Sequence, residues 1–194
     1  MNRFLVRGQR VAAVAATTAL LLGTSLAAQA QKVKLATSAG DIVLELDKAK
    51  APKTVDNFVQ YVKDGHYNGT IFHRVIPTFM IQGGGMTADM NEKKTRAPIP
   101  LESKNGLSNL RGSVAMARTN DPNSATSQFF INVQDNPRLD AANARDGNGY
   151  AVFGKVISGM EVVDKIRAVP TASRGMHDDV PMTPVTINKA TIEK

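Results

Sequence analysis

The sequence predicts a mainly β protein, an eight-stranded antiparallel closed β-barrel capped by two α-helices. Segments with strand character are short and close together along the chain, and there are about eight of them. Only two segments carry apolar residues at helical spacing. This pattern favours an antiparallel barrel or sandwich over alternating βαβ units. Because a closed barrel also leaves no exposed sheet edge, we expect a barrel.

The first thirty residues precede this domain. Residues 1–10 carry three arginines and no acid, residues 11–26 are apolar, and Ala28-Gln29-Ala30 has the small-x-small form of a signal-peptidase site. The apolar run is too short and too rich in Ala and Thr to be a strong membrane anchor. We expect residues 1–30 to be a cleavable signal peptide and residues 31–194 a single domain. The mature protein should then be periplasmic, or secreted, without stable membrane association.

Composition narrows the classes of function. Without the three arginines of the leader, 21 basic residues stand against 17 acidic ones, and the net charge falls from +7 to +4. No basic run is longer than Lys93-Lys94, so nucleic-acid binding is not expected. The chain has no cysteine, which excludes disulfides, thiol chemistry and cysteine-based zinc sites.

The domain should begin with a hairpin followed by a helix. Residues 33–47 contain two alternating apolar runs around the turn Ser38-Ala39-Gly40-Asp41. Residues 51–65 then carry one apolar helical stripe, with Pro52 in the first turn and Gly65 at the C-terminal end. The stripe consists of Val55, Phe58, Val59 and Val62.

The rest of the domain is predicted to be mostly strands. Two strands, 70–76 and 79–83, are separated by Pro77, and the triple glycine 83–85 is expected to let the second strand end in a sharp turn. Residues 84–112 are polar and turn-rich, which predicts a long surface excursion. The remaining expected elements are strands at 113–117, 128–133, 150–156 and 184–194, and a helix at 159–169 that stops before Pro170.

Most catalytic motifs do not occur in the sequence. The three histidines have neither HxxxH nor HxH spacing, and with no cysteine a metal site is not expected. We expect His66 in a turn and His177 in a loop. No GxSxG elbow, P-loop or Rossmann glycine pattern is found. The sequence therefore predicts no cofactor and no metal.

One arginine stands out in an apolar segment. Residues 72–85 read FHRVIPTFMIQGGG, with Arg74 inside a strand-type run. A guanidinium is almost never buried without partners, so Arg74 either faces water from a half-exposed strand or points at a ligand. Candidate pocket walls are Phe79, Met80, Met116, Phe129 and Phe130, and candidate amide donors are Gln82, Gln128 and Asn132.

Strand alternation separates these candidates. In the segment 127–133, Gln128, Phe130 and Asn132 lie on one face, and Phe129 and Ile131 lie on the other. The residues then indicate an apolar pocket with one arginine and a few amides. Taken alone, they leave catalysis and binding both open.

Four segments resemble the signature segments of cyclophilins, the peptidyl-prolyl cis–trans isomerases. They are 72–84, 112–118, 127–133 and 149–166, in the family's order and with comparable spacing. The resemblance runs from about residue 32 to the C-terminus, and the version MART…SATSQFFINV is similar to the bacterial exported branch. It implies the same eight-stranded barrel capped by two helices.

The resemblance also implies roles for particular residues. Arg74 matches the family's catalytic arginine, and Arg138 falls where cyclosporin-sensitive members carry Trp, which implies weak cyclosporin binding. Arg118 stands where many eukaryotic members have Asn, and Tyr150 where they have His. The residues that match substrate-pocket and peptide-backbone contacts are Phe79, Met80, Gln82, Phe130, Leu139, Gln128 and Ala117.

The implied function is an enzyme that accelerates rotation about X–Pro bonds during the folding of exported proteins. Its partners would be unfolded or partly folded proline-containing polypeptides, it would act as a monomer, and it would need no cofactor. In the twisted transition state Arg74 would donate a hydrogen bond to the proline nitrogen. The alternative is a binding module or holdase chaperone that grips proline-containing segments with little turnover.

Overall fold

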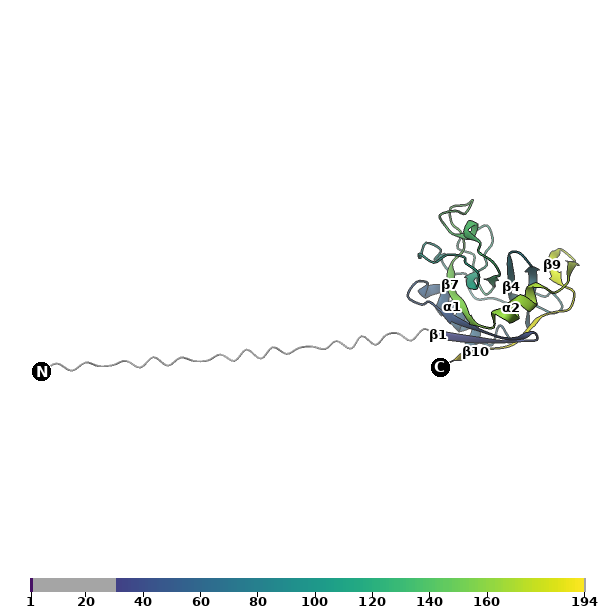
Figure 1. Ribbon diagram of the computed structural model, residues 1–194, viewed down its shortest axis with the longest axis horizontal. Helices are drawn as coiled ribbons and strands as arrows, with labels where there is room; N and C mark the ends of the chain where they lie inside the picture. Colours follow the sequence, from purple (N-terminus) through teal and green to yellow (C-terminus); the bar gives the residue numbers. More distant parts are fainter. Residues whose placement is uncertain (2–30, 194) are drawn as a thin grey trace.

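Eight antiparallel strands close into a barrel in the computed structural model, which describes residue 1 and residues 31–193 (Figure 1). The predicted signal peptide lies outside the described residues except for Met1. Around the barrel the strands follow the order β1, β10, β3, β4, β6, β5, β7, β2. Their bounds are β1 Gln31–Thr37, β2 Gly40–Leu46, β3 Thr70–Ile76, β4 Met80–Thr87, β5 Ser113–Met116, β6 Phe129–Asn132, β7 Val152–Ser158 and β10 Thr186–Glu193. The predicted fold class is confirmed.

Two α-helices pack on the barrel. Helix α1 (Pro52–Lys63) contacts β10, and α2 (Met160–Arg167) contacts β2, β3 and β4. Helix α1 starts at its proline, and the carboxylate of Glu102 accepts hydrogen bonds from the backbone N–H groups of Lys53 and Thr54. These N–H groups have no partner within the helix, so Glu102 stabilises the helix start from a distant loop. No helix in the described part of the chain combines the length and apolarity needed to cross a membrane.

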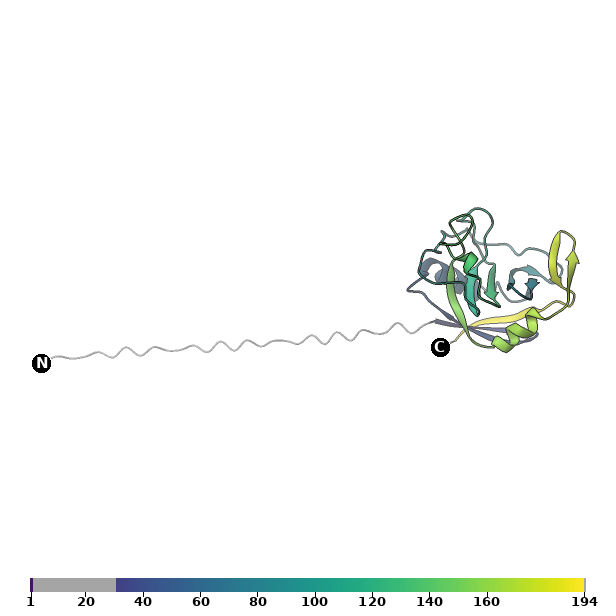
Figure 2. The ribbon, with the colours of Figure 1, turned by 45° about the horizontal axis from the view of Figure 1, so that its top comes forward.

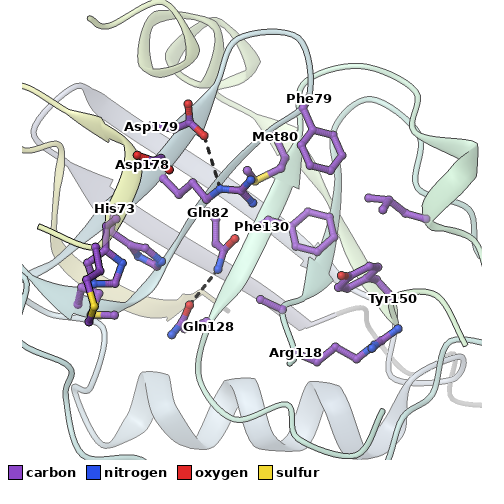
Figure 3. A pocket seen from close by; sticks show the side chains of 16 residues that line it. His73, Phe79, Met80, Gln82, Arg118, Gln128, Phe130, Tyr150, Asp178 and Asp179 are labelled. Carbon is purple, nitrogen blue, oxygen red and sulfur yellow. Dashed lines mark hydrogen bonds and ion pairs between the residues drawn. The ribbon is translucent and has the colours of Figure 1, made fainter. Parts of the chain in front are cut away.

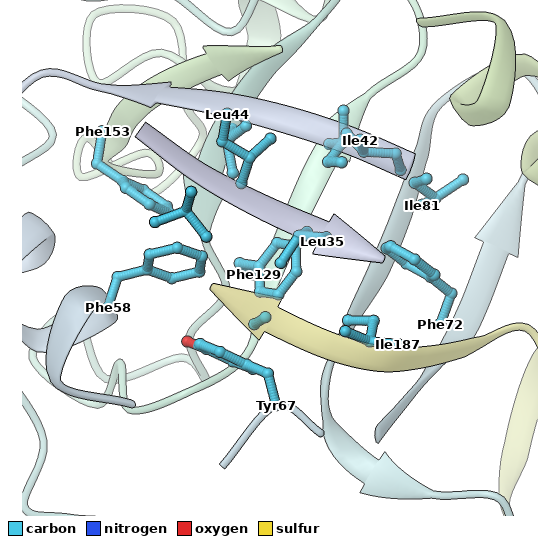
Figure 4. Close-up of a cluster of buried hydrophobic side chains, with 14 of the residues drawn as sticks. Leu35, Ile42, Leu44, Phe58, Tyr67, Phe72, Ile81, Phe129, Phe153 and Ile187 are labelled. Carbon is cyan, nitrogen blue, oxygen red and sulfur yellow. The ribbon is translucent and has the colours of Figure 1, made fainter. Parts of the chain in front are cut away.

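The barrel interior is filled by its own side chains (Figure 4). Strands β1 and β2 bury every second residue, which is the period expected when one strand face meets a core. Each large apolar side chain buried in this way contributes about 1.5–3 kcal/mol. The fully buried residues of this main core include Leu35, Ile42, Leu44, Phe58, Tyr67, Phe72, Ile81, Phe129, Phe153 and Ile187.

The triple glycine does not end a strand, as the sequence had led us to expect. Strand β4 continues through residues 83–85 to Thr87. A Cβ atom at Gly84 would lie 3.0 Å from the ring of Phe129, and one at Gly85 would lie 2.5 Å from Cγ of Gln128. Gly84 and Gly85 are therefore needed where Phe129 of β6 and the preceding residue, Gln128, pack closely against β4.

An additional hairpin stands at the side of the barrel (Figures 1 and 2). Strands β8 (Thr171–Arg174) and β9 (His177–Pro181) form a separate two-stranded sheet. His177, which we expected in a loop, is the first residue of β9, whereas His66 lies in a turn as expected. The segment was missed because it is short, polar and mostly exposed, so it lacks an apolar alternation.

Candidate active site

A cavity of about 570 Å³ lies on the side of β3, β4 and β6 that is turned away from the main core (Figure 3). Ten of the candidate site residues line it: Arg74, Phe79, Met80, Gln82, Ala117, Arg118, Gln128, Phe130, Leu139 and Tyr150. The structure thus gathers in one place residues that are up to 76 positions apart in the sequence, from Arg74 to Tyr150. Their individual roles stay predictions.

Strand register sets the arrangement of the central residues. Arg74 of β3 pairs with Gln82 of β4, Gln82 pairs with Phe130 of β6, and Phe130 pairs with Ala115 of β5. Residues directly opposite one another in antiparallel strands project from the same face. One row across four strands therefore places a guanidinium, an amide and an aromatic ring side by side at the cavity.

The floor of the cavity is apolar. Met80 and Phe130 are only 2% and 4% exposed, and they pack with Ala115 and Val152 in a cluster separate from the main core. The ring of Tyr150 meets the ring of Phe130 edge-on, with centroids 5.5 Å apart. Phe79, Leu139 and Ala117 border the same cluster. Such a floor favours an apolar ring or side chain over a charged one.

Arg74 stands at the edge of this floor. Its side chain is 43% exposed, and its Nε lies 3.8 Å from Oδ2 of Asp179 in β9. Next to it, Gln82 Nε2 donates a hydrogen bond of 2.9 Å to Gln128 Oε1. The cavity therefore offers a cation and an amide pair within reach of whatever occupies the apolar floor.

His73 lies beside Arg74 and is 5% exposed. Burial, together with the nearby charges of His177 and Arg74, lowers the pKa of His73 from 6.5 to about 4. His73 is therefore neutral at pH 7 and adds no positive charge next to the guanidinium. Among the described residues its Nδ1 has no hydrogen-bond partner.

Arg118 uses its side chain to support the cavity wall. The guanidinium, with the side chain only 4% exposed, donates to the carbonyl oxygens of Gly149 and Thr119, each at 2.9 Å, and pairs with Asp146. It also stacks 4.7 Å from the centroid of Tyr150. Backbone N–H donation from the turn around Asp146 and this ion pair lower the pKa of that carboxyl to about 2. These contacts fix the 146–150 segment beside the cavity.

Three candidates from the sequence do not line the cavity. Met116 and Phe129 belong to the main core because they alternate with the cavity-facing residues of their strands. Asn132 is fully buried, where it donates to Asn109 and Ser113 and accepts a hydrogen bond from Asn136. Its amide is thus used inside the fold.

Six lining residues were not among the predicted site residues: His73, Met86, Met176, His177, Asp178 and Asp179. Four of them come from the β8–β9 hairpin, whose position beside the cavity no local pattern indicates. A sequence signal existed only for His73, which neighbours Arg74 in the strand. In the described part of the chain, no three His, Asp or Glu side chains gather as a metal site would require.

Comparison with known proteins gives close relatives. A peptidyl-prolyl cis–trans isomerase of Streptomyces antibioticus is 61% identical over 161 residues, covering 82% of this chain and 97% of the relative. Peptidyl-prolyl cis–trans isomerase B of Escherichia coli is 53% identical over 159 residues, covering 81% and 97%. The similarity therefore extends over nearly the whole length of these enzymes.

Solved structures agree with the sequence comparison. A Cryptosporidium parvum cyclophilin-type isomerase, crystallised in the presence of the dipeptide Ala-Pro, superposes with a TM-score of 0.70 at 29% identity and covers 84% of this chain and 99% of that one. The family model of the cyclophilin-type peptidyl-prolyl cis–trans isomerases matches residues 32–192. With this match over most of its length, the chain belongs to the cyclophilin-type peptidyl-prolyl cis–trans isomerase family.

Proposed function

We propose that this chain is an exported peptidyl-prolyl cis–trans isomerase that assists the folding of other exported proteins, with Arg74 as its catalytic residue. Membership of the family makes the chain a peptidyl-prolyl cis–trans isomerase. The observation that carries the mechanism is the row in which Arg74 stands beside Gln82 and Phe130 at the edge of an apolar floor.

The chemistry needs neither a nucleophile nor a metal. Rotation about an X–Pro bond breaks amide resonance and has a barrier of about 18–20 kcal/mol. In the twisted transition state the proline nitrogen regains a lone pair, and a hydrogen bond from Arg74 to that nitrogen is stronger there than in the planar ground state. Only such differential binding raises the rate. Stabilisation by roughly 5–8 kcal/mol corresponds to an acceleration of about 10⁴–10⁶-fold.

The remaining lining supports this assignment. Met80, Phe130 and Leu139 would hold the pyrrolidine ring and keep water from the guanidinium, which strengthens its electrostatic contact. The Gln82–Gln128 amide pair and the backbone at 117–118 would hold the flanking peptide while one side of the bond rotates. The substrates would be unfolded or partly folded polypeptides that contain proline.

Export rests on residues 1–30. Their basic start, apolar run and Ala28-Gln29-Ala30 motif are the features of a signal peptide, so the mature protein should begin at Gln31 and reside in the periplasm. Cleavage there would leave all of β1 intact. Intact-mass measurement of the protein from the exported fraction tests this, and a membrane-bound species that retains residues 1–30 would contradict it.

The mechanism is tested by Arg74→Ala in a protease-coupled isomerase assay on the 31–194 chain. We expect kcat/KM to fall by about 10²–10³, the loss seen when one preorganised donor is removed. Arg74→Lys should recover little, because an ammonium does not reproduce the planar fork of a guanidinium. The matched control is Arg145→Ala, since Arg145 is an exposed arginine of a loop outside the cavity lining.

Peptide affinity separates catalysis from simple binding. If Arg74 acts on the transition state, Arg74→Ala should bind a proline-containing peptide nearly as tightly as the parent while turning it over far more slowly. A binding module or holdase would instead show little turnover in the parent itself. Near-parent turnover in Arg74→Ala would contradict the catalytic role of the arginine.

A further inference from the structure

The β8–β9 hairpin contains a bulge next to the cavity. The strand register shifts between Ala172 and Arg174 of β8, so one residue of β8 stands opposite two residues of β9, Asp178 and Asp179. Asp179 has a φ of 60°, in the left-handed region that aspartate tolerates better than most residues with a side chain. Bulges re-aim side chains and are frequent next to active sites.

One buried side chain and two hydrogen bonds hold this bulge in place. Val180, the residue after Asp179 in β9, is 3% exposed. Ser173 Oγ donates a hydrogen bond of 2.6 Å to Oδ1 of Asp178 across the bulge. Arg174 Nη1 donates a hydrogen bond of 2.7 Å to the carbonyl oxygen of Ala88, just beyond the end of β4. The hairpin is therefore tied to the barrel on both of its strands.

The bulge brings the carboxylate of Asp179 to Arg74. The two side chains are 41% and 43% exposed, and the contact joins Oδ2 to Nε at 3.8 Å, drawn as a dashed line in Figure 3. Nε is the inner donor of the guanidinium fork, so pairing there leaves both terminal Nη groups for the cavity. Without a partner, a half-exposed arginine would have many rotamers to lose on reaching one geometry.

We infer that Asp179 is a positioning residue for Arg74, an inference that rests on the proposed catalytic role of the arginine. Its carboxylate restrains the guanidinium so that the terminal N–H groups face the apolar floor, where the proline nitrogen would lie. A substrate that covers the cavity excludes water, and the lower local dielectric strengthens the attraction between the two charges. The restraint is therefore greatest while a substrate occupies the cavity.

The test uses Asp179→Asn, which keeps the size of the side chain and tolerates a positive φ but removes the charge. We expect kcat/KM in the protease-coupled assay to fall about three- to tenfold, with the affinity for an Ala-Pro-containing peptide in an NMR titration unchanged. Asp179→Gly, which adopts the same φ without strain, should behave alike. Asp89→Asn removes the same charge from a nearby exposed position outside the cavity lining and should leave kcat/KM unchanged.

A double-mutant cycle separates positioning from a merely structural effect. In an Arg74→Ala background, Asp179→Asn should cause no further loss, because the group on which it acts is gone. The Nε–Hε resonance of Arg74 should also move in Asp179→Asn and stay in place in Asp89→Asn.

Three outcomes would overturn the inference. The first is unchanged or higher kcat/KM in both Asp179 variants. It would mean that the carboxylate has no effect on catalysis or only weakens the positive potential that Arg74 creates at the cavity. The second is an equal loss with and without Arg74, and the third is a parallel loss of peptide affinity. Failure of the proposed function itself is distinguishable, since it would appear as near-parent turnover in Arg74→Ala.

Discussion

Acid should destabilise this fold in a pH window set by His73. The folded protein holds the pKa of His73 at about 4, mainly through burial, against an ordinary value of 6.5 in the unfolded chain. Between these two values the unfolded state binds a proton that the folded state does not. The stability associated with neutral His73 is therefore complete above pH 6.5 and is lost progressively as the pH falls through 4.

The two pKa values set the size of the effect. At 1.36 kcal/mol for each pKa unit, the difference amounts to about 3 kcal/mol of unfolding free energy. Burial also lowers the pKa of His66, which adds to the loss in the same direction. Asp146, whose pKa is lowered from 3.8 to about 2, destabilises the fold only at still lower pH, so the two contributions are separable.

Urea unfolding of the parent and of His73→Gln, at steps from pH 7.5 to 4, measures this effect. Glutamine stays neutral throughout, so the parent should lose about 3 kcal/mol more than the variant over this range. An NMR titration of the His73 ring in the folded protein should give a pKa near 4. Parallel stability curves for the two proteins, or a ring that titrates near 6.5, would refute the reasoning.

Three other substitutions test the cavity. Phe130→Ala should lower peptide affinity as well as kcat/KM, because the ring forms part of the cavity floor. The free energy of unfolding measured in urea should fall by about 3 kcal/mol, because the ring also packs against its neighbours. Unchanged peptide affinity would contradict the place of Phe130 in the floor. Gly85→Ala should lower kcat/KM, because the new Cβ would displace the Gln128 side chain and break its hydrogen bond to Gln82. A crystal structure of the variant with that hydrogen bond intact would contradict this prediction. Arg138 stacks 4.7 Å from the centroid of the Phe79 ring at the cavity edge. Arg138→Trp should tighten cyclosporin binding by about 1–3 kcal/mol in a titration and leave small-peptide turnover nearly unchanged. Equal cyclosporin affinity would mean that Arg138 does not stand where cyclosporin-sensitive family members carry Trp.

Elements with a local pattern were predictable from the sequence. Strand β3 has the bounds that were expected, 70–76, and α1 starts at Pro52 and buries the predicted stripe. Both depend on neighbouring residues alone: β3 is a short apolar run that ends before Pro77, and α1 has apolar residues at the helical period. The separation of Phe130 from Phe129 on opposite strand faces follows from the same rule.

Features that depend on distant residues were not predictable in this way. The glycines at 84–85 were misread because the side chains that exclude a Cβ there belong to Tyr67, Gln128 and Phe129, none of which is a neighbour in the sequence. Strand pattern and composition had already singled out six of the ten residues in the cavity, and the family resemblance added Ala117, Arg118, Leu139 and Tyr150. Neither indicated Asp179, which reaches Arg74 from the bulge in β9. No periodicity in the polar segment 171–181 indicates where the hairpin lies.

Adjacent rows of the same strands explain how the site is held rigid. The row next to Arg74, Gln82 and Phe130 consists of Val75, Ile81, Ile131 and Val114, which pair across β3, β4, β6 and β5 and have no exposed surface. Because successive residues of a strand point to opposite faces, each cavity residue is attached to a neighbour locked in the core. The backbone under the guanidinium is thus fixed by the barrel, and the freedom that remains is in the arginine side chain itself. A substitution at Asp179, in a hairpin that contributes none of the barrel strands, should therefore alter the orientation of Arg74 without disturbing the fold that carries it.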